Sequence, residues 1–322
     1  MGVRRMACVL AVLGGCGGAA EAPVATLPDV ETSSSAPARG PVDPATARRD
    51  YLAQWSRCLT RTGGRLARSW ARLERDIDLD KQRVRTKGVQ PWFDAVEPAL
   101  LRSCPLGDDV PAGIDAAVPK QGRAFVLAAR GYGNRAAELQ EYFDTEAYVS
   151  DDWETMRRAL PELATAHDEA YAAADTFART LAIALDATDE AWLKALKDAG
   201  KTDSAPWHVV QTAKAGRATL GCITATVPLP TECTSAAERF ASAREGLEGY
   251  REAHRADVVG IFWFDVFRLR ADDLAEAMAG LQAPRSRRKK TAEAQGDAAA
   301  LRVAQARAEL QAARDTVSFD FP

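Results

Sequence analysis

The sequence predicts an all-α protein, an elongated antiparallel helical bundle built around a long helical hairpin. From about residue 45 onward, apolar side chains recur every three or four residues, which places them on one face of a helix. The longest row runs from Trp153 to Ala184, and a second row runs from Phe125 to Phe143. No segment has the persuasive apolar–polar alternation that is typical of strands. The two rows should therefore pack as the two arms of the hairpin.

The first sixteen residues have the features of an export signal. Arg4 and Arg5 precede the short apolar run Met6–Leu13, which is too short to cross a bilayer of about 30 Å as a helix. The run ends in Leu13-Gly14-Gly15-Cys16, which resembles the lipobox of bacterial lipoproteins. That resemblance implies cleavage before Cys16 and lipidation of its sulfur. An ordinary signal peptide, in which Cys16 has no role, is the alternative.

Composition then divides the chain into four parts. A signal peptide is expected over residues 1–15, and the lipidated Cys16 with a disordered tether over residues 16–44. The tether is rich in proline and serine, has no aromatic residue, and cannot bury enough apolar surface to fold. An all-helical domain should follow over residues 45–283. A basic linker and an Ala-rich C-terminal helix, about 291–315, should complete the chain over residues 284–322.

Within the helical domain, each element is predicted from its own spacing. A long helix should begin near residue 45 and end near Ile77, and a short one should cover Trp92–Arg102. Ser150, followed by two aspartates, should cap the arm that begins at Trp153. Helical spacing continues through four further segments, which are Glu190–Ala199, Trp207–Gly221, Ser235–Asp257 and Val258–Leu281.

Two segments near the C-terminus have unusual compositions. Ile261-Phe262-Trp263-Phe264 with Phe267 is apolar on all sides, which predicts a central helix buried all round, or else a patch that contacts a membrane. The final helix has only a thin apolar stripe, so it is expected to pack lightly or to fray.

Four cysteines remain after the signal and the lipidation site are set aside. In an exported protein an even number of cysteines favours disulfides over free thiols. Four cysteines allow three pairings, and chain order favours Cys58–Cys104 and Cys222–Cys233. A metal site formed by these cysteines is the alternative, but no Cys-x-x-Cys pair is present.

One segment resembles a known family. It comprises Leu139-Gln140-Glu141-Tyr142-Phe143, then Ala147-Tyr148-Val149-Ser150-Asp151-Asp152, then Leu160-Pro161. This pattern resembles the YiiG-like bacterial lipoproteins, a family of unknown function, over roughly residues 115–184. The resemblance implies an all-helical envelope lipoprotein and brings no catalytic residue.

The sequence contains no motif that identifies an enzyme. It lacks a Gly-x-Ser-x-Gly elbow, a His-Glu-x-x-His helix, a phosphate loop and a dinucleotide fingerprint. Three histidines are present, His167, His208 and His254. His167 and His254 lie on apolar stripes and are expected to be core residues rather than ligands or bases. Asp168 follows His167 directly, and adjacent helical residues are not expected to face each other.

We therefore expect no catalytic residue, no cofactor and no metal. The acids Asp144, Glu146, Asp151 and Asp152 offer a calcium site as a weaker alternative to helix capping. A formal net charge of −3 gives no basic face for nucleic acid. The predicted function is a lipid-anchored, non-catalytic binding or scaffolding module of the cell envelope, with an envelope protein or cell-wall partner. The alternatives are an envelope hydrolase and a carrier of apolar ligands.

The lipidation hypothesis predicts the behaviour of Cys16→Ala. Without a sulfur to acylate, the chain should leave the membrane fraction or accumulate with its leader uncut. Cell fractionation and mass spectrometry of the N-terminus measure both outcomes. Full membrane retention with normal processing would contradict the hypothesis.

Overall fold

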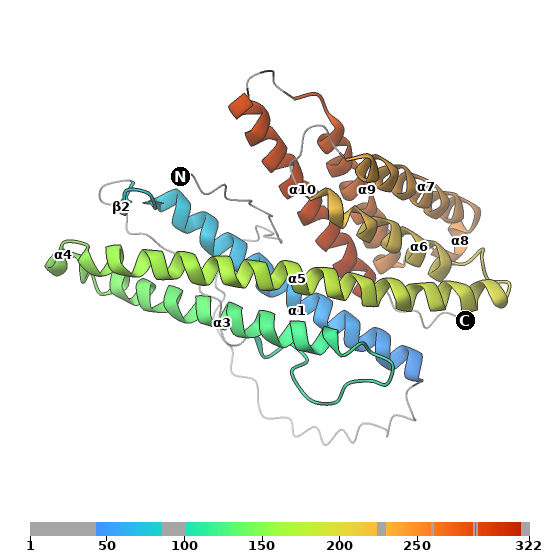
Figure 1. Cartoon of the computed structure of the whole chain (residues 1–322). Helices are drawn as coiled ribbons and strands as arrows, with labels where there is room; N and C mark the ends of the chain where they lie inside the picture. The colour runs from blue at the N-terminus through green and yellow to red at the C-terminus, as the bar shows by residue number, and fades with distance from the viewer. Residues whose placement is uncertain are drawn as a thin grey trace, which may run out of the picture.

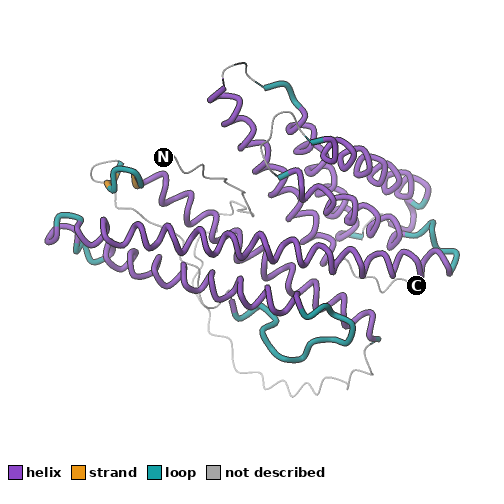
Figure 2. Tube along the Cα trace, viewed as in Figure 1, coloured by secondary structure: helices purple, strands orange, loops and turns teal. Residues whose placement is uncertain are grey.

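The computed structural model describes residues 43–85, 101–223, 230–258, 261–285, 287 and 289–316. These residues are almost entirely helical, which confirms the predicted all-α class (Figure 1) (Figure 2). The signal peptide, Cys16 and nearly all of the tether lie outside the described residues, as does the helix predicted over Trp92–Arg102 except for its last two residues. No described helix combines the length and apolar character that a membrane span needs.

The described elements are mostly helices. In chain order they are α1 (Pro44–Asp76), β1 (Ile77–Asp78), β2 (Arg83–Val84), α3 (Ala117–Asp144), α4 (Tyr148–Asp151), α5 (Glu154–Asp198), α6 (Ala205–Arg217), the 3-10 turn η1 (Ala218–Cys222), α7 (Thr231–Ala253), α8 (Arg255–Val258), α9 (Phe262–Gln282) and α10 (Lys289–Thr316). The two strands are an antiparallel pair of two residues each, at the end of α1. The sequence did not predict this pair, because two residues are too few to show an alternating pattern.

Helix α5 is the longest element and takes part in both halves of the structure. Its first part lies beside α3 and crosses α1, and its last part contacts α6 (Figure 1). It has 45 residues and α3 has 28, so the two helices are not matched arms of equal length. Leu139, Leu160, Leu163 and Phe177 are buried in one hydrophobic cluster, as their spacing predicts.

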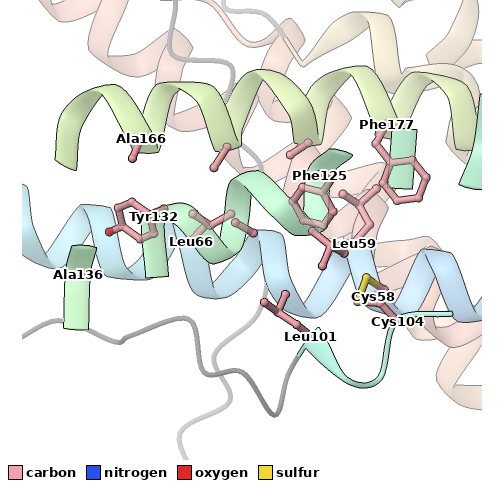
Figure 3. Packing of buried hydrophobic residues seen from close by; sticks show 14 of the residues in the cluster. Cys58, Leu59, Leu66, Leu101, Cys104, Phe125, Tyr132, Ala136, Ala166 and Phe177 are labelled. Carbon is pink, nitrogen blue, oxygen red and sulfur yellow. A yellow bond between two sulfur atoms is a disulfide. The ribbon is translucent and has the colours of Figure 1, made fainter. Parts of the chain in front are cut away.

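The first cluster joins α1, α3 and α5. Figure 3 shows its centre, where Leu59 of α1 lies near Phe125 of α3 and Phe177 of α5, and Leu66 of α1 lies nearer to Tyr132 of α3. A close approach of α3 to α1 depends on Gly122, because a Cβ at this position would lie 2.6 Å from ring carbons of the buried Trp55. The lack of a side chain at Gly122 is therefore what lets the indole fill the space between the helices.

The second cluster joins α6, α7, α9 and α10, and α10 packs against α9 and α6 and also against α1. Val303, Ala304 and Leu310 are fully or almost fully buried, and Arg307 and Arg314 on the same helix are also buried. The prediction that this helix packs lightly was therefore wrong. Alanine allows neighbouring helices to approach closely. Arg314 looked like a solvent-facing residue in the sequence because its partner Asp189 is 125 residues away in the chain.

The aromatic segment at the start of α9 is buried on one side only. Phe264 and Phe267 are completely buried, whereas the side chain of Phe262 is 80% exposed and Trp263 is partly exposed. The expectation of a helix buried all round was wrong here. A three-residue separation places Phe264 and Phe267 on one face, and Phe262 points away from it.

The start of α5 is capped differently from the prediction. Ser150 lies in α4, where its hydroxyl donates to the carbonyl of Ala147. Asp151 is the capping residue, because its two oxygens accept hydrogen bonds from the N–H groups of Trp153 and Thr155, each at 3.0 Å. The hydroxyl of Tyr142 donates to the same carboxylate at 2.7 Å, and these bonds lower the pKa of Asp151 to about 2.

Two disulfides are present, and they are the pairs that chain order favours. Cys58 of α1 is joined to Cys104, with 5.0 Å between the Cα atoms, and holds the segment before α3 against α1 (Figure 3). Cys222 in η1 is joined to Cys233 in α7, with 5.3 Å between the Cα atoms. By restricting the unfolded chain, each such bond typically contributes about 2–4 kcal/mol to stability.

The packing of α5 against α3 predicts a strong contrast between two adjacent residues. Leu163 is 1% exposed, so Leu163→Ala should lower the free energy of unfolding by about 2–5 kcal/mol through lost burial and a cavity. Glu162 faces solvent, and Glu162→Ala should cost less than about 0.5 kcal/mol. Chemical denaturation measures both values. Equally mild effects would mean that Leu163 does not lie in a packed core.

Candidate functional site

A groove lies between the start of α1, the segment that leads into α3, and the outer face of α5. Its volume is about 800 Å³, within the range of pockets that bind small ligands, which is about 300–1,000 Å³. The three walls are remote in sequence. Residues 43–49, 113–117 and 180–195 supply them, so only the folded chain brings them together.

The floor of the groove is a row of small side chains on α5. Residues on this row are three or four positions apart and so share one helical face. They are Thr180, Ile183, Ala184, Ala187, Thr188, Ala191, Trp192 and Ala195. Ile183 is 71% exposed and adds a large aliphatic side chain to this face. The row gives the groove an apolar floor.

Two arginines from the first turns of α1 form one wall. The guanidinium of Arg49 lies over the ring of Trp192, with its Cζ 4.4 Å from the ring centroid, and donates to the hydroxyl of Thr46 at 3.0 Å. Arg48 lies against Gly113, where a Cβ would meet its Nη1 at 2.7 Å. Gly113 has φ of +85°, a conformation that favours glycine, so the segment leaves space for the Arg48 side chain.

Two carboxylates also lie at the rim, and both are bound to backbone N–H groups. Asp43 caps α1 by accepting from the N–H of Thr46 at 3.1 Å, and this bond lowers its pKa. Asp115 accepts from the N–H of Ala117 at 2.8 Å, at the start of α3. Each carboxylate is thus directed toward a helix N-terminus, where negative charge is stabilised. The guanidinium of Arg48 remains directed toward Gly113.

Behind the floor, α5 takes part in a buried network of charges. Asp189 is completely buried, and its oxygens accept from Arg217 of α6 and, at 2.5 Å, from Arg314 of α10. Arg217 also donates from Nε to Asp186 at 2.9 Å and from Nη1 to Gln311 at 3.1 Å. Three helices are therefore joined at one carboxylate.

Arg49 lies between the groove and these charges. Burial lowers the pKa of Arg49, and the nearby positive charge of Arg314 lowers it further, while the carboxylates of Asp50, Asp43 and Asp189 oppose the shift. For Arg217, burial alone would lower the pKa, but the carboxylates of Asp189 and Asp186 raise it above its ordinary value. Arg217 therefore depends on these two carboxylates for compensation of its charge.

His167 is a buried residue, as predicted. It is 8% exposed, and its ring stacks on Trp70 with the centroids 4.0 Å apart. The expectation that Asp168 does not face it was wrong, because Asp168 Oδ1 lies 3.3 Å from His167 Nδ1. The carboxylate reaches the imidazole edge along the helix surface.

His254 is not a core residue, which corrects the prediction. It follows α7 directly, and its Nε2 lies 3.1 Å from Asp203 Oδ2 before α6. His208 lies on the other side of the same carboxylate, with Nε2 3.9 Å from Oδ1, and burial lowers its pKa. Tyr250 stacks on His254 with ring centroids 4.4 Å apart. These contacts link α6 to α7.

The acids and cysteines considered as metal ligands have other roles. Asp151 caps α5, Asp144 accepts from Gln140 at 2.7 Å, and Cys58, Cys104, Cys222 and Cys233 form disulfides. Across the described parts of the chain, no three His, Cys, Asp or Glu side chains lie close enough to hold a metal ion.

The groove was not predicted from the sequence. One signal was present, since Thr180 to Ala195 repeats small residues on the face opposite Leu181, Leu185 and Leu193. A row of alanines on an exposed helical face predicts no cavity by itself, because the walls of the cavity come from other segments. Comparison with family models, curated proteins and solved structures gave no match.

The buried network predicts a large effect for Asp189→Ala. Removing this carboxylate leaves Arg217 and Arg314 buried without their shared partner, so the free energy of unfolding should fall by about 3–5 kcal/mol. Asp198→Ala on the same helix removes an exposed pair with Lys194 and should cost under about 1 kcal/mol. Urea denaturation compares the two variants. If both lose less than 1 kcal/mol, the network does not hold the helices together.

Proposed function

We propose that this chain is a lipid-anchored cell-envelope protein that acts as a non-catalytic binding module, with the groove on α5 as its binding surface. The observation that carries this proposal is the combination in one cavity of an apolar floor, an exposed Ile183 and the Arg48 side chain. Pockets that bind ligands have this composition, mostly apolar with a few polar groups that fix orientation.

The lipid anchor in this proposal is supported by the sequence alone. Leu13–Cys16 resembles a lipobox, and Gly17 in place of an aspartate favours the outer membrane, with the protein facing the periplasm. Asp43, the first described residue, lies at the rim of the groove. The tether would therefore join the folded domain at the rim of the binding surface.

An envelope hydrolase has less support. Hydrolases bring titratable groups together in a pocket, where a base and a nucleophile can act on a substrate. Here His167 stacks on Trp70, and His208 and His254 share Asp203. All three histidines lie away from the lining of the groove. Their contacts hold helices together instead of meeting in this cavity.

A position-specific crosslink tests the binding function. A photoreactive phenylalanine analogue replaces Ile183 in the full chain, and cells are irradiated with the envelope intact. A binding module should give a defined adduct at this position, detected by mass spectrometry of the peptide that carries residue 183. The adduct mass distinguishes a small molecule from a protein.

The matched control places the same analogue at Leu127 on α3, which is 64% exposed. Leu127 is a large aliphatic residue on a helix surface, as Ile183 is, but it lies outside the groove. An adduct at residue 183 alone supports the proposal. Equal labelling at both positions, or no adduct at residue 183, would argue against it.

A further inference from the structure

We propose that the groove binds a fatty acid as its carboxylate. This inference rests on the proposed binding function and names the class of ligand. The acyl chain would lie along the small-residue floor of α5, and the carboxylate would lie at the end where Arg48 meets Gly113.

The shape of the floor fits one extended chain. From Thr180 to Ala195 the groove follows about four turns of α5, or roughly 22 Å at 1.5 Å per residue. Alanine and threonine side chains are small and leave space above the helix, and Ile183 and Trp192 supply larger apolar contacts. An acyl chain would cover apolar surface that now faces water, which favours its binding.

The charges at the rim favour an anion over a cation. Asp43 and Asp115 point their oxygens at backbone N–H groups of α1 and α3. Arg49 is held over Trp192, whereas Arg48 lies against an exposed glycine at the groove wall. An arginine presents paired N–H donors that match the two oxygens of a carboxylate.

The single row of floor residues also limits what can bind. One face of one helix, closed by α1 on one side and by residues 113–117 on the other, gives room for one chain. An acidic amphipathic helix of a partner protein is the competing occupant, and the experiment below separates the two.

The test uses the full-length chain with Cys16→Ser, so that the protein carries no acyl group of its own. Laurate and dodecyltrimethylammonium are titrated separately by calorimetry, each below its critical micelle concentration. The two probes share a twelve-carbon chain and differ in head-group charge. Laurate should bind saturably with one site, and the cationic probe should bind at least about tenfold more weakly.

Two pairs of variants locate the site. Arg48→Gln should weaken laurate binding at least about tenfold, whereas Arg130→Gln, at an exposed position on α3, should leave it unchanged. Ile183→Glu should abolish binding, and Leu127→Glu should not. All four positions are at least partly exposed, so equal denaturation midpoints can verify that each variant is folded.

Several results would overturn the inference. They are no binding of laurate, equal affinity for the two probes, or unchanged laurate binding by both Arg48→Gln and Ile183→Glu. If laurate does not bind and residue 183 still crosslinks to one protein, the ligand class is wrong and the binding function stands. If neither laurate nor any crosslinked species is found at residue 183, both proposals fail.

Discussion

The carboxylate of Asp189 is the constraint on which the arrangement of the two clusters depends. It lies on α5, the one helix that belongs to both halves of the molecule, and it pairs with arginines from α6 and α10. A buried ion pair gives little net stability, because each charge loses its hydration. Its geometric demand is nevertheless strict, since a displaced helix would leave a buried charge without a partner. The network therefore fixes how α6 and α10 lie on α5.

The same helix then carries the groove on its other side. Asp189 is buried, while the neighbouring Thr188 and Trp192 line the groove. The same turn of α5 therefore carries the ion network on one face and the groove on another. Arg49 of α1 lies between the two, because its guanidinium lies over the ring of Trp192 and the positive charge of Arg314 contributes to lowering its pKa. The groove and the buried ion network therefore share one helix, α5.

Sequence patterns predicted the first cluster well and the second one poorly. The spacing of Leu160, Leu163 and Phe177 identified a buried face. Burial of leucine and phenylalanine is favourable against any apolar neighbour, so it needs no specific partner. Helix α10 gave no such signal. Its alanines bury little area each, and an arginine such as Arg314 is usually buried only where a carboxylate compensates its charge. The prediction of the residue that caps α5 was wrong for a related reason. The carboxylate of Asp151 is held in place partly by the hydroxyl of Tyr142, which belongs to another helix.

The sequence by itself determined the helical class, the positions of most helices, the buried face of α5 and the order that favours the two disulfides. These features depend on local periodicity and on residue type, which can be read from each segment without knowledge of the rest of the fold. Only the tertiary structure decided that much of α10 is buried, that His254 shares Asp203 with His208, and that residues 43–49, 113–117 and 180–195 enclose a groove. The physical reason is that charge compensation and cavities arise between segments distant in the chain, whose proximity no local pattern records.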